Sequence, residues 1–271
     1  MINTGLNKKA IDEIKSLARQ KLIEYSKLND VIGGQIFSIL ELQAKVLYYP
    51  IEDEEVWGFF EVIKGKSFVW INTAIPYDKQ VFAAAHELYH LWFEKGGEII
   101  LRSDIEETND TENIPENELR ANRFAAEFLT NEELLLQEIR NYNMDKNKLD
   151  IKDILRLSNL FIVPYKAMVR RLYEIKLINK ERYNQFMKLT NEQIEIWRNR
   201  LGLSIPIRDK KISLSDLIDR AMELYERKKI TREKLEHLLN FAELTLEGMG
   251  IGKEEPYTPP TDEELDAIME E

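Results

Sequence analysis

The sequence of 271 residues contains no cysteine. Without thiols the chain can form neither a disulfide bond nor a zinc site built on thiolates, and this lack is typical of cytoplasmic proteins. Any zinc site must therefore use histidine and carboxylate ligands. Histidine is scarce too, because only His86, His90 and His237 are present, so few residues can serve as nitrogen ligands.

Long apolar runs and a surplus of basic residues are missing as well. No apolar run reaches the roughly 18–20 residues needed to span a bilayer, and residues 1–20 are typical of a charged amphipathic helix rather than of a signal peptide. The net charge is −11, of which −7 lies in the tail formed by residues 253–271. We therefore expect no membrane partner, and the charge argues against a basic nucleic-acid-binding protein.

The composition that remains, 44% hydrophobic and 32% charged, is typical of a soluble globular protein of one to two domains. Helical periodicity predicts an amphipathic helix over residues 7–28 and further helical segments from residue 116 onward, among them the range 213–248. Two β-prone runs, 56–63 and 67–74, flank a glycine-containing turn and predict a hairpin. The acidic stretch 97–115 is expected to be a surface loop, with a selective rim above a cleft as the alternative.

The most informative stretch is His86-Glu87-Leu88-Tyr89-His90, which lies in an apolar, helix-forming segment. Histidines four residues apart lie on one face of a helix, with Cβ atoms about 5–6 Å apart, so both imidazoles can reach one ion. Glu87 follows about 100° further round the helix, where it can face the ion without binding it. This is the H-E-x-x-H pattern of zinc peptidases, with the glutamate as general base. The alternative is a pair of core histidines satisfied by hydrogen bonds.

A catalytic zinc site needs a third protein ligand and an open position for water. The best candidate is Glu118, on the core-facing side of the helix predicted over residues 116–129. Asn122 lies one turn later and could orient a ligand. Glu116 and Glu127 compete for the same role, and spacing alone leaves the choice open. The third histidine lies far along the chain and is expected to be structural, because a lone histidine on a helix is seldom a ligand.

Several motifs resemble those of the ImmA/IrrE family of metallo-endopeptidases, over roughly residues 7–178. They are Ala85-His86-Glu87-x-x-His90-Leu91, Glu118-x-x-Ala121-Asn122-x-Phe124-Ala125-Ala126-x-x-Leu129, Trp57-Gly58-Phe59 and Ile71-Asn72-Thr73-x-Ile75-Pro76. The sequence departs from the family at Tyr89, where glycine is common, and at Thr130-Asn131, where Met-Pro is common. Neither departure falls on a candidate ligand.

The resemblance implies an α+β, zincin-like metallopeptidase domain, in which a small twisted sheet lies against the active-site helices. It implies that His86, His90 and Glu118 bind Zn²⁺ and that Glu87 is the catalytic base. The implied substrates are cytoplasmic helix-turn-helix repressors of mobile elements or stress responses, and some relatives form toxin–antitoxin pairs with such a regulator. An extended substrate is expected to pair with the edge strand of the hairpin. Tyr77, Tyr89 and Tyr165 are open candidates for the oxyanion donor.

A competing interpretation is a regulator that binds a repressor or DNA without cutting it. Residues 150–178 resemble a helix-turn-helix, with basic side chains at Lys166, Arg170, Arg171 and Lys176. The alternative, which the acidic net charge favours, is a helical packing unit behind the active site.

The sequence thus predicts four regions. They are a zincin-like metallopeptidase domain (residues 1–148), a helix-turn-helix-like region (149–189), a C-terminal helical region (190–252) and an acidic tail (253–271). No oligomeric state is predicted.

Overall fold

The computed structural model describes residues 5–94, 99–102, 114–241 and 244–252. The chain divides into two compact units, Met1–Asp216 and Leu217–Glu271. Most of the predicted acidic loop and the whole acidic tail lie outside the described residues. The first unit contains the sheet and all the predicted metal ligands.

The first unit is built on a five-stranded sheet with the order β4-β2-β3-β1-β5. The strands are β1 (Lys45–Tyr49), β2 (Val56–Ile63), β3 (Lys66–Asn72), β4 (Ile99–Arg102) and β5 (Ser213–Leu214). β1 runs parallel to β3, whereas the pairs β2–β3, β2–β4 and β1–β5 are antiparallel. Together with the helices below, this mixed sheet makes the chain an α+β protein, as predicted.

The predicted hairpin is confirmed as β2 and β3, joined by Lys64 and Gly65. Both turn residues have positive φ, 51° and 75°, which matches the twist of a two-residue type I′ turn. β3 ends at Asn72, whose buried side-chain oxygen accepts hydrogen bonds from the backbone N–H groups of Ile51 and Ala74, both at 2.9 Å. This amide turns the chain out of the sheet and toward the helix that carries the motif.

Two strands were not predicted. β4 forms inside the stretch expected to be a loop, and it pairs with β2. β5 forms where the sequence predicted the start of a helical region: Ser213 pairs with Tyr48 of β1, and Ser215 Oγ accepts from the N–H of Val46 at 2.9 Å. Since β4 covers β2 and β1 covers β3, the expectation that a substrate pairs with an edge of the hairpin is wrong.

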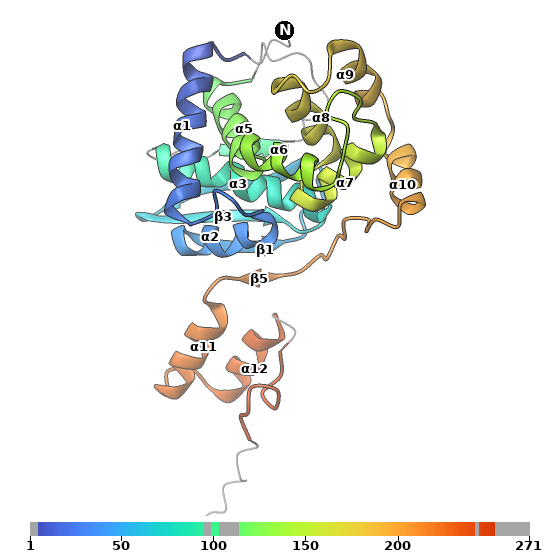
Figure 1. Cartoon of the computed structure of the whole chain (residues 1–271). Helices are drawn as coiled ribbons and strands as arrows, with labels where there is room; N and C mark the ends of the chain where they lie inside the picture. Colours follow the sequence, from blue (N-terminus) through green and yellow to red (C-terminus); the bar gives the residue numbers. More distant parts are fainter. Residues whose placement is uncertain (1–4, 95–98, 103–113, 242–243, 253–271) are drawn as a thin grey trace, which may run out of the picture. The chain divides into compact units, whose positions relative to one another are not determined.

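Helices cover the sheet in the first unit (Figure 1). They begin with α1 (Lys8–Glu24), the 3₁₀ turn η1 (Gly33–Gln35), α2 (Ile36–Gln43), α3 (Tyr77–Phe93) and α5 (Glu116–Leu129). α3 packs on β2 and β3, α5 and α2 pack on α3, and α1 packs on α5. The two helices that carry the candidate ligands, α3 and α5, are therefore neighbours in the core.

Five shorter helices follow α5 in the first unit: α6 (Glu132–Asn141), α7 (Ile151–Phe161), α8 (Tyr165–Glu174), α9 (Lys180–Met187) and α10 (Asn191–Arg200). α7 ends at Ile162 in the left-handed conformation, and α8 begins after Pro164. The two helices of the predicted helix-turn-helix-like region are thus present, with their apolar faces in the core of the first unit.

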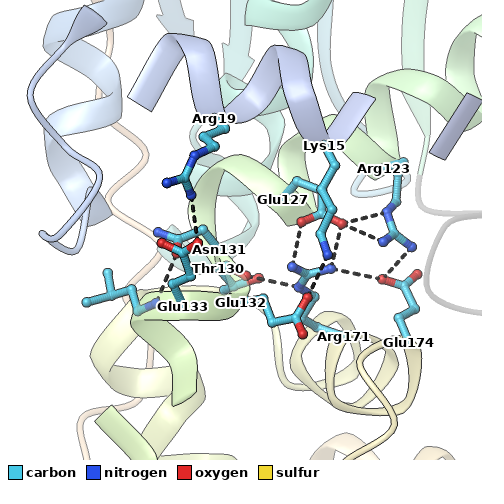
Figure 2. Close-up of polar contacts among 11 residues, drawn as sticks. Lys15, Arg19, Arg123, Glu127, Thr130, Asn131, Glu132, Glu133, Arg171 and Glu174 are labelled. Carbon is cyan, nitrogen blue, oxygen red and sulfur yellow. Dashed lines mark hydrogen bonds and ion pairs between the residues drawn. The ribbon is translucent and has the colours of Figure 1, made fainter. Parts of the chain in front are cut away.

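Arg171 of α8 does not point outward (Figure 2). Its side chain is 1% exposed and donates two hydrogen bonds to the Glu127 carboxylate, at 2.8 and 2.6 Å, and one to the Thr130 carbonyl at 2.9 Å. Arg123 and Glu174 join the same buried cluster. Because Arg171 is enclosed and paired, the competing interpretation is wrong in assigning it to a basic DNA-facing surface, and its burial agrees with the alternative of a helical packing unit.

The second unit contains α11 (Leu217–Glu226) and α12 (Arg232–Asn240). A small core of Ala221, Leu235, Leu239 and Leu246 holds it together. The region predicted to be helical over 213–248 thus contains two helices, and Lys228 takes a positive φ of 56° in the turn between them. Within the described part of the chain, none of the helices is both long and apolar enough to cross a membrane.

Candidate metal centre

The motif helix α3 places both histidines in the core. Asp78 lies inside the first turn after Pro76, where its charge interacts favourably with the helix dipole. The next two turns are fully buried and include three consecutive alanines, which allow the helix to lie close to the sheet. His86, Glu87 and His90 follow, and all three are 0% exposed.

The side chains of His86, His90 and Glu118 converge on one point. The two Nε2 atoms of the histidines are 3.0 Å apart. The Glu118 carboxylate lies 3.1 Å from Nε2 of His86 and 3.5 Å from Nε2 of His90. One ligand atom from each residue lies within 4.8 Å of the other two, so this group could hold a metal ion.

The three glutamates of α5 lie in different surroundings. Glu116 is exposed and lies 3.7 Å from Arg120 on the same helix. Glu127 is buried, but it faces away from the histidines and pairs with Arg171 and Arg123. Only Glu118, of these three, is brought to the histidine pair.

Each histidine is held at its other ring nitrogen. Nδ1 of His86 lies 2.8 Å from Oδ1 of Asn122, the residue predicted to orient a ligand. Nδ1 of His90 lies 2.7 Å from Oε2 of Glu94. Glu94 was missed in the sequence, although its spacing of four residues from His90 was a signal that could have revealed it.

The Glu87 carboxylate is fully buried and lacks hydrogen-bond partners among the described residues. Neither of its carboxylate oxygens has a hydrogen-bond partner among the residues that the structure describes. Burial raises the pKa of Glu87 well above its usual range, and the charge of Glu118 adds to that effect. Gly58 of β2 leaves room for this carboxylate, because a Cβ there would lie 3.4 Å from Oε1 of Glu87 and 2.9 Å from the Trp70 carbonyl oxygen.

The pKa values of His90 and Glu118 are both lowered. Burial lowers the pKa of His90, and the neighbouring His86 lowers it further. Burial alone would raise the pKa of Glu118, but its interactions with His86 and His90 outweigh that effect and lower the pKa. Neutral imidazole and ionised carboxylate are the forms that bind metal.

The tyrosine candidates are engaged elsewhere. The Tyr89 hydroxyl accepts a hydrogen bond from Nε of Arg120 at 3.0 Å, and the Tyr165 hydroxyl donates to the Phe186 carbonyl at 3.5 Å. Tyr77 is in the first turn of α3, about 13 Å along the helix axis from His86 at 1.5 Å per residue. The choice of an oxyanion donor among these three stays open.

Comparison with protein families identifies a match to a peptidase family. The family model described as the IrrE N-terminal-like domain, Peptidase_M78, matches residues 40–173, a range that includes both α3 and α5. Comparison with curated proteins finds none that matches the chain. The sequence-based resemblance to the ImmA/IrrE family is thereby confirmed over the matched range.

Proposed function

Over residues 40–173 the chain belongs to the IrrE N-terminal-like family of M78 peptidases, and from that premise we propose that it is a zinc-dependent endopeptidase. The observation that carries the proposal is the convergence of His86, His90 and Glu118 from two neighbouring helices. Family membership supports a metallopeptidase, and the three side chains supply the donors that such an enzyme requires.

The donor set fits zinc. Two imidazole nitrogens and one carboxylate are the ligands of many catalytic zinc sites, and they leave the fourth position open. With each Nδ1 proton donated to Asn122 or Glu94, the lone pairs of both Nε2 atoms face one another across 3.0 Å. A cation between them turns that repulsion into attraction, so the arrangement supports occupation by a metal.

Glu87 is the proposed general base and acid. A bound Zn²⁺ supplies Lewis acidity, which acidifies the attacking water and polarises the scissile carbonyl. The Glu87 carboxylate accepts a proton from the water as the new C–O bond forms, and returns it to the amine nitrogen as the C–N bond breaks. Its raised pKa supports this role, because it makes the carboxylate a stronger proton acceptor than an ordinary glutamate.

The substrate is proposed to be a cytoplasmic protein, specifically a helix-turn-helix repressor of a mobile element or a stress response. Support for this finer assignment comes from the resemblance to the ImmA/IrrE family, as does the further proposal of a toxin–antitoxin pairing. The zinc site, by contrast, is supported by the chain's own geometry.

The non-catalytic alternative is a protein that binds a repressor or DNA through residues 150–178. One of the four basic side chains that supported it is buried. Arg171 is enclosed in the protein, which leaves Lys166, Arg170 and Lys176 as the basic side chains of that region. DNA binding normally needs a broad basic face, and the net charge of −11 opposes it.

The test is a comparison of wild type with Glu87→Gln. We expect wild type to purify with about one zinc per chain and to cleave a repressor encoded at a neighbouring locus. The variant keeps the ligands, so it should keep the metal but lose at least ~10²-fold in cleavage rate. The exposed Glu55 provides the control, because Glu55→Gln should change neither property. Wild-type cleavage by Glu87→Gln would remove Glu87 from the chemistry.

A further inference from the structure

Glu94 is tied to His90 twice. It is the residue at which α3 ends, and its backbone N–H donates to the His90 carbonyl at 3.0 Å. Its side chain then reaches back, so that Oε2 lies 2.7 Å from Nδ1 of the same histidine. The side chain is 23% exposed, whereas the ring that it contacts is 0% exposed. Glu94 therefore closes the solvent side of a buried imidazole.

The two histidines consequently have partners of different charge. His86 meets a neutral amide oxygen at Asn122, whereas His90 meets a carboxylate. Accepting the Nδ1 proton fixes the tautomer in which Nε2 carries the lone pair, and Nε2 is the atom that faces Glu118. A carboxylate accepts that proton more strongly than an amide does and makes the imidazole a better donor to a metal.

We propose that Glu94 is a positioning residue that orients and polarises His90 for metal binding. This inference rests on the proposed metal site and adds to it a residue outside the H-E-x-x-H motif. The same carboxylate ends the motif helix and holds its second ligand. Neither the family match nor the cluster of the three candidate ligands includes this role.

The test measures metal binding by the full chain and does not depend on activity. Zn²⁺ affinity is determined by competition with a chromophoric chelator, and the geometry of the site by the visible absorption of the Co²⁺-substituted protein. We expect Glu94→Ala to weaken binding by about 10–100-fold and to change the Co²⁺ spectrum. Glu94→Gln should lie much nearer to wild type, since its amide oxygen still accepts the Nδ1 proton.

Glu138→Ala is the matched control. Like Glu94, Glu138 forms a hydrogen bond with a nearby residue of its own helix, since its carboxylate accepts from the Asn141 side chain at 3.1 Å. Glu138 lies on α6, which carries no candidate metal ligand. We expect its Zn²⁺ affinity and Co²⁺ spectrum to equal those of wild type. Far-ultraviolet circular dichroism of each metal-free variant verifies that the fold is intact, and the nearly isosteric Gln variant keeps the test decisive if the Ala variant unfolds.

A Glu94→Ala protein that binds Zn²⁺ as tightly as wild type, with an unchanged Co²⁺ spectrum, would overturn the inference. If Glu94→Ala unfolds, the Gln variant decides: a Zn²⁺ affinity of Glu94→Gln that is reduced by more than about 100-fold relative to wild type would contradict the acceptor role. Glu118→Ala separates this failure from failure of the proposed site. Tight binding that depends on Glu118 but not on Glu94 refutes only the positioning role, whereas wild type that binds no metal refutes both.

Discussion

Glu87 shows how a single residue can be placed for chemistry at the expense of stability. A carboxylate buried without a partner is costly, because it must either lose its charge or keep it in a medium of low polarity. The raised pKa of Glu87 is the result. A raised folded-state pKa contributes stability that is complete below the unfolded-state pKa and is lost as the pH rises through the folded-state value.

Glu87→Gln should therefore make the metal-free protein more stable at pH 8, because the amide removes the cost of the buried charge. The gain should shrink as the pH falls and level off below 4.5, the ordinary pKa of a glutamate, because wild-type Glu87 is then protonated in both states. Chemical unfolding of both metal-free proteins at several pH values measures this difference. A variant that is less stable than wild type at pH 8 would show that the carboxylate has partners that offset its burial.

Gly58 is the second residue whose identity is dictated by the site. A methyl group at this position would lie 2.9 Å from the Trp70 carbonyl oxygen, which belongs to the paired backbone of β3 and cannot easily move. We expect Gly58→Ala to lower the free energy of unfolding by about 1–3 kcal/mol, as overpacking usually does. Gly252→Ala is the control, because a Cβ there meets nothing within 4 Å. Equal urea midpoints for both variants would contradict the expected clash.

At the scale of elements, α5 is fixed at its C-terminal end by the cluster of Arg171, Glu127, Arg123 and Glu174 (Figure 2). The guanidinium of Arg171 also binds the Thr130 carbonyl, one of the free acceptors at the end of that helix. α5 carries Glu118 and Asn122 near its other end. Arg171, which the competing interpretation assigned to DNA binding, thus helps to hold the helix that carries the third candidate ligand.

Arg171→Ala should cost about 3–5 kcal/mol of stability, because it leaves the buried Glu127 with only part of its compensating charge. Arg19→Ala provides the contrast, since the pair between Arg19 and Glu133 is 51% and 67% exposed and such pairs contribute at most about 1 kcal/mol. Denaturant unfolding should therefore show a clearly larger loss of unfolding free energy for Arg171→Ala than for Arg19→Ala. Similar losses would mean that the buried cluster contributes no more than a surface pair.

Elements with a strong local pattern were predictable, and those fixed by distant partners were not. The hairpin and α3 follow from turn chemistry and apolar periodicity within a few residues. β5 depends on Ser215 and Val46, which are far apart in the chain, so its sequence could equally suggest a helix start. In the site, His86 and His90 come from one short motif, whereas Glu118 needed the family resemblance and its placement needed the structure.

At the scale of the whole molecule, all candidate ligands and the main core belong to the unit Met1–Asp216. We expect a protein truncated after Asp216 to unfold cooperatively and to bind metal as the full chain does. Circular dichroism melting and metal analysis measure the two properties. A truncated protein that is unfolded, or that binds no metal, would show that residues 217–271 are needed for the site.

The position of the cut should matter. Residues 205–215 run beside the start of α3 and the edge of the sheet: the Tyr77 N–H donates to the Ile207 carbonyl at 2.9 Å, and the Lys210 N–H donates to the Thr73 carbonyl at 3.1 Å. Truncation after Ser204 removes these bonds together with β5, so this protein should melt at a lower temperature than the one ending at Asp216. Equal melting temperatures would contradict a stabilising role for the segment.

That segment also has a mechanical consequence. Tension applied to the chain beyond Asp216 would first load the short antiparallel ladder between β5 and β1, and then the backbone bonds at Ile207 and Lys210 that border the first turn of α3. Pulling on the C-terminal unit would thus be transmitted to the base of the helix that presents His86 and His90, before any core side chain is exposed.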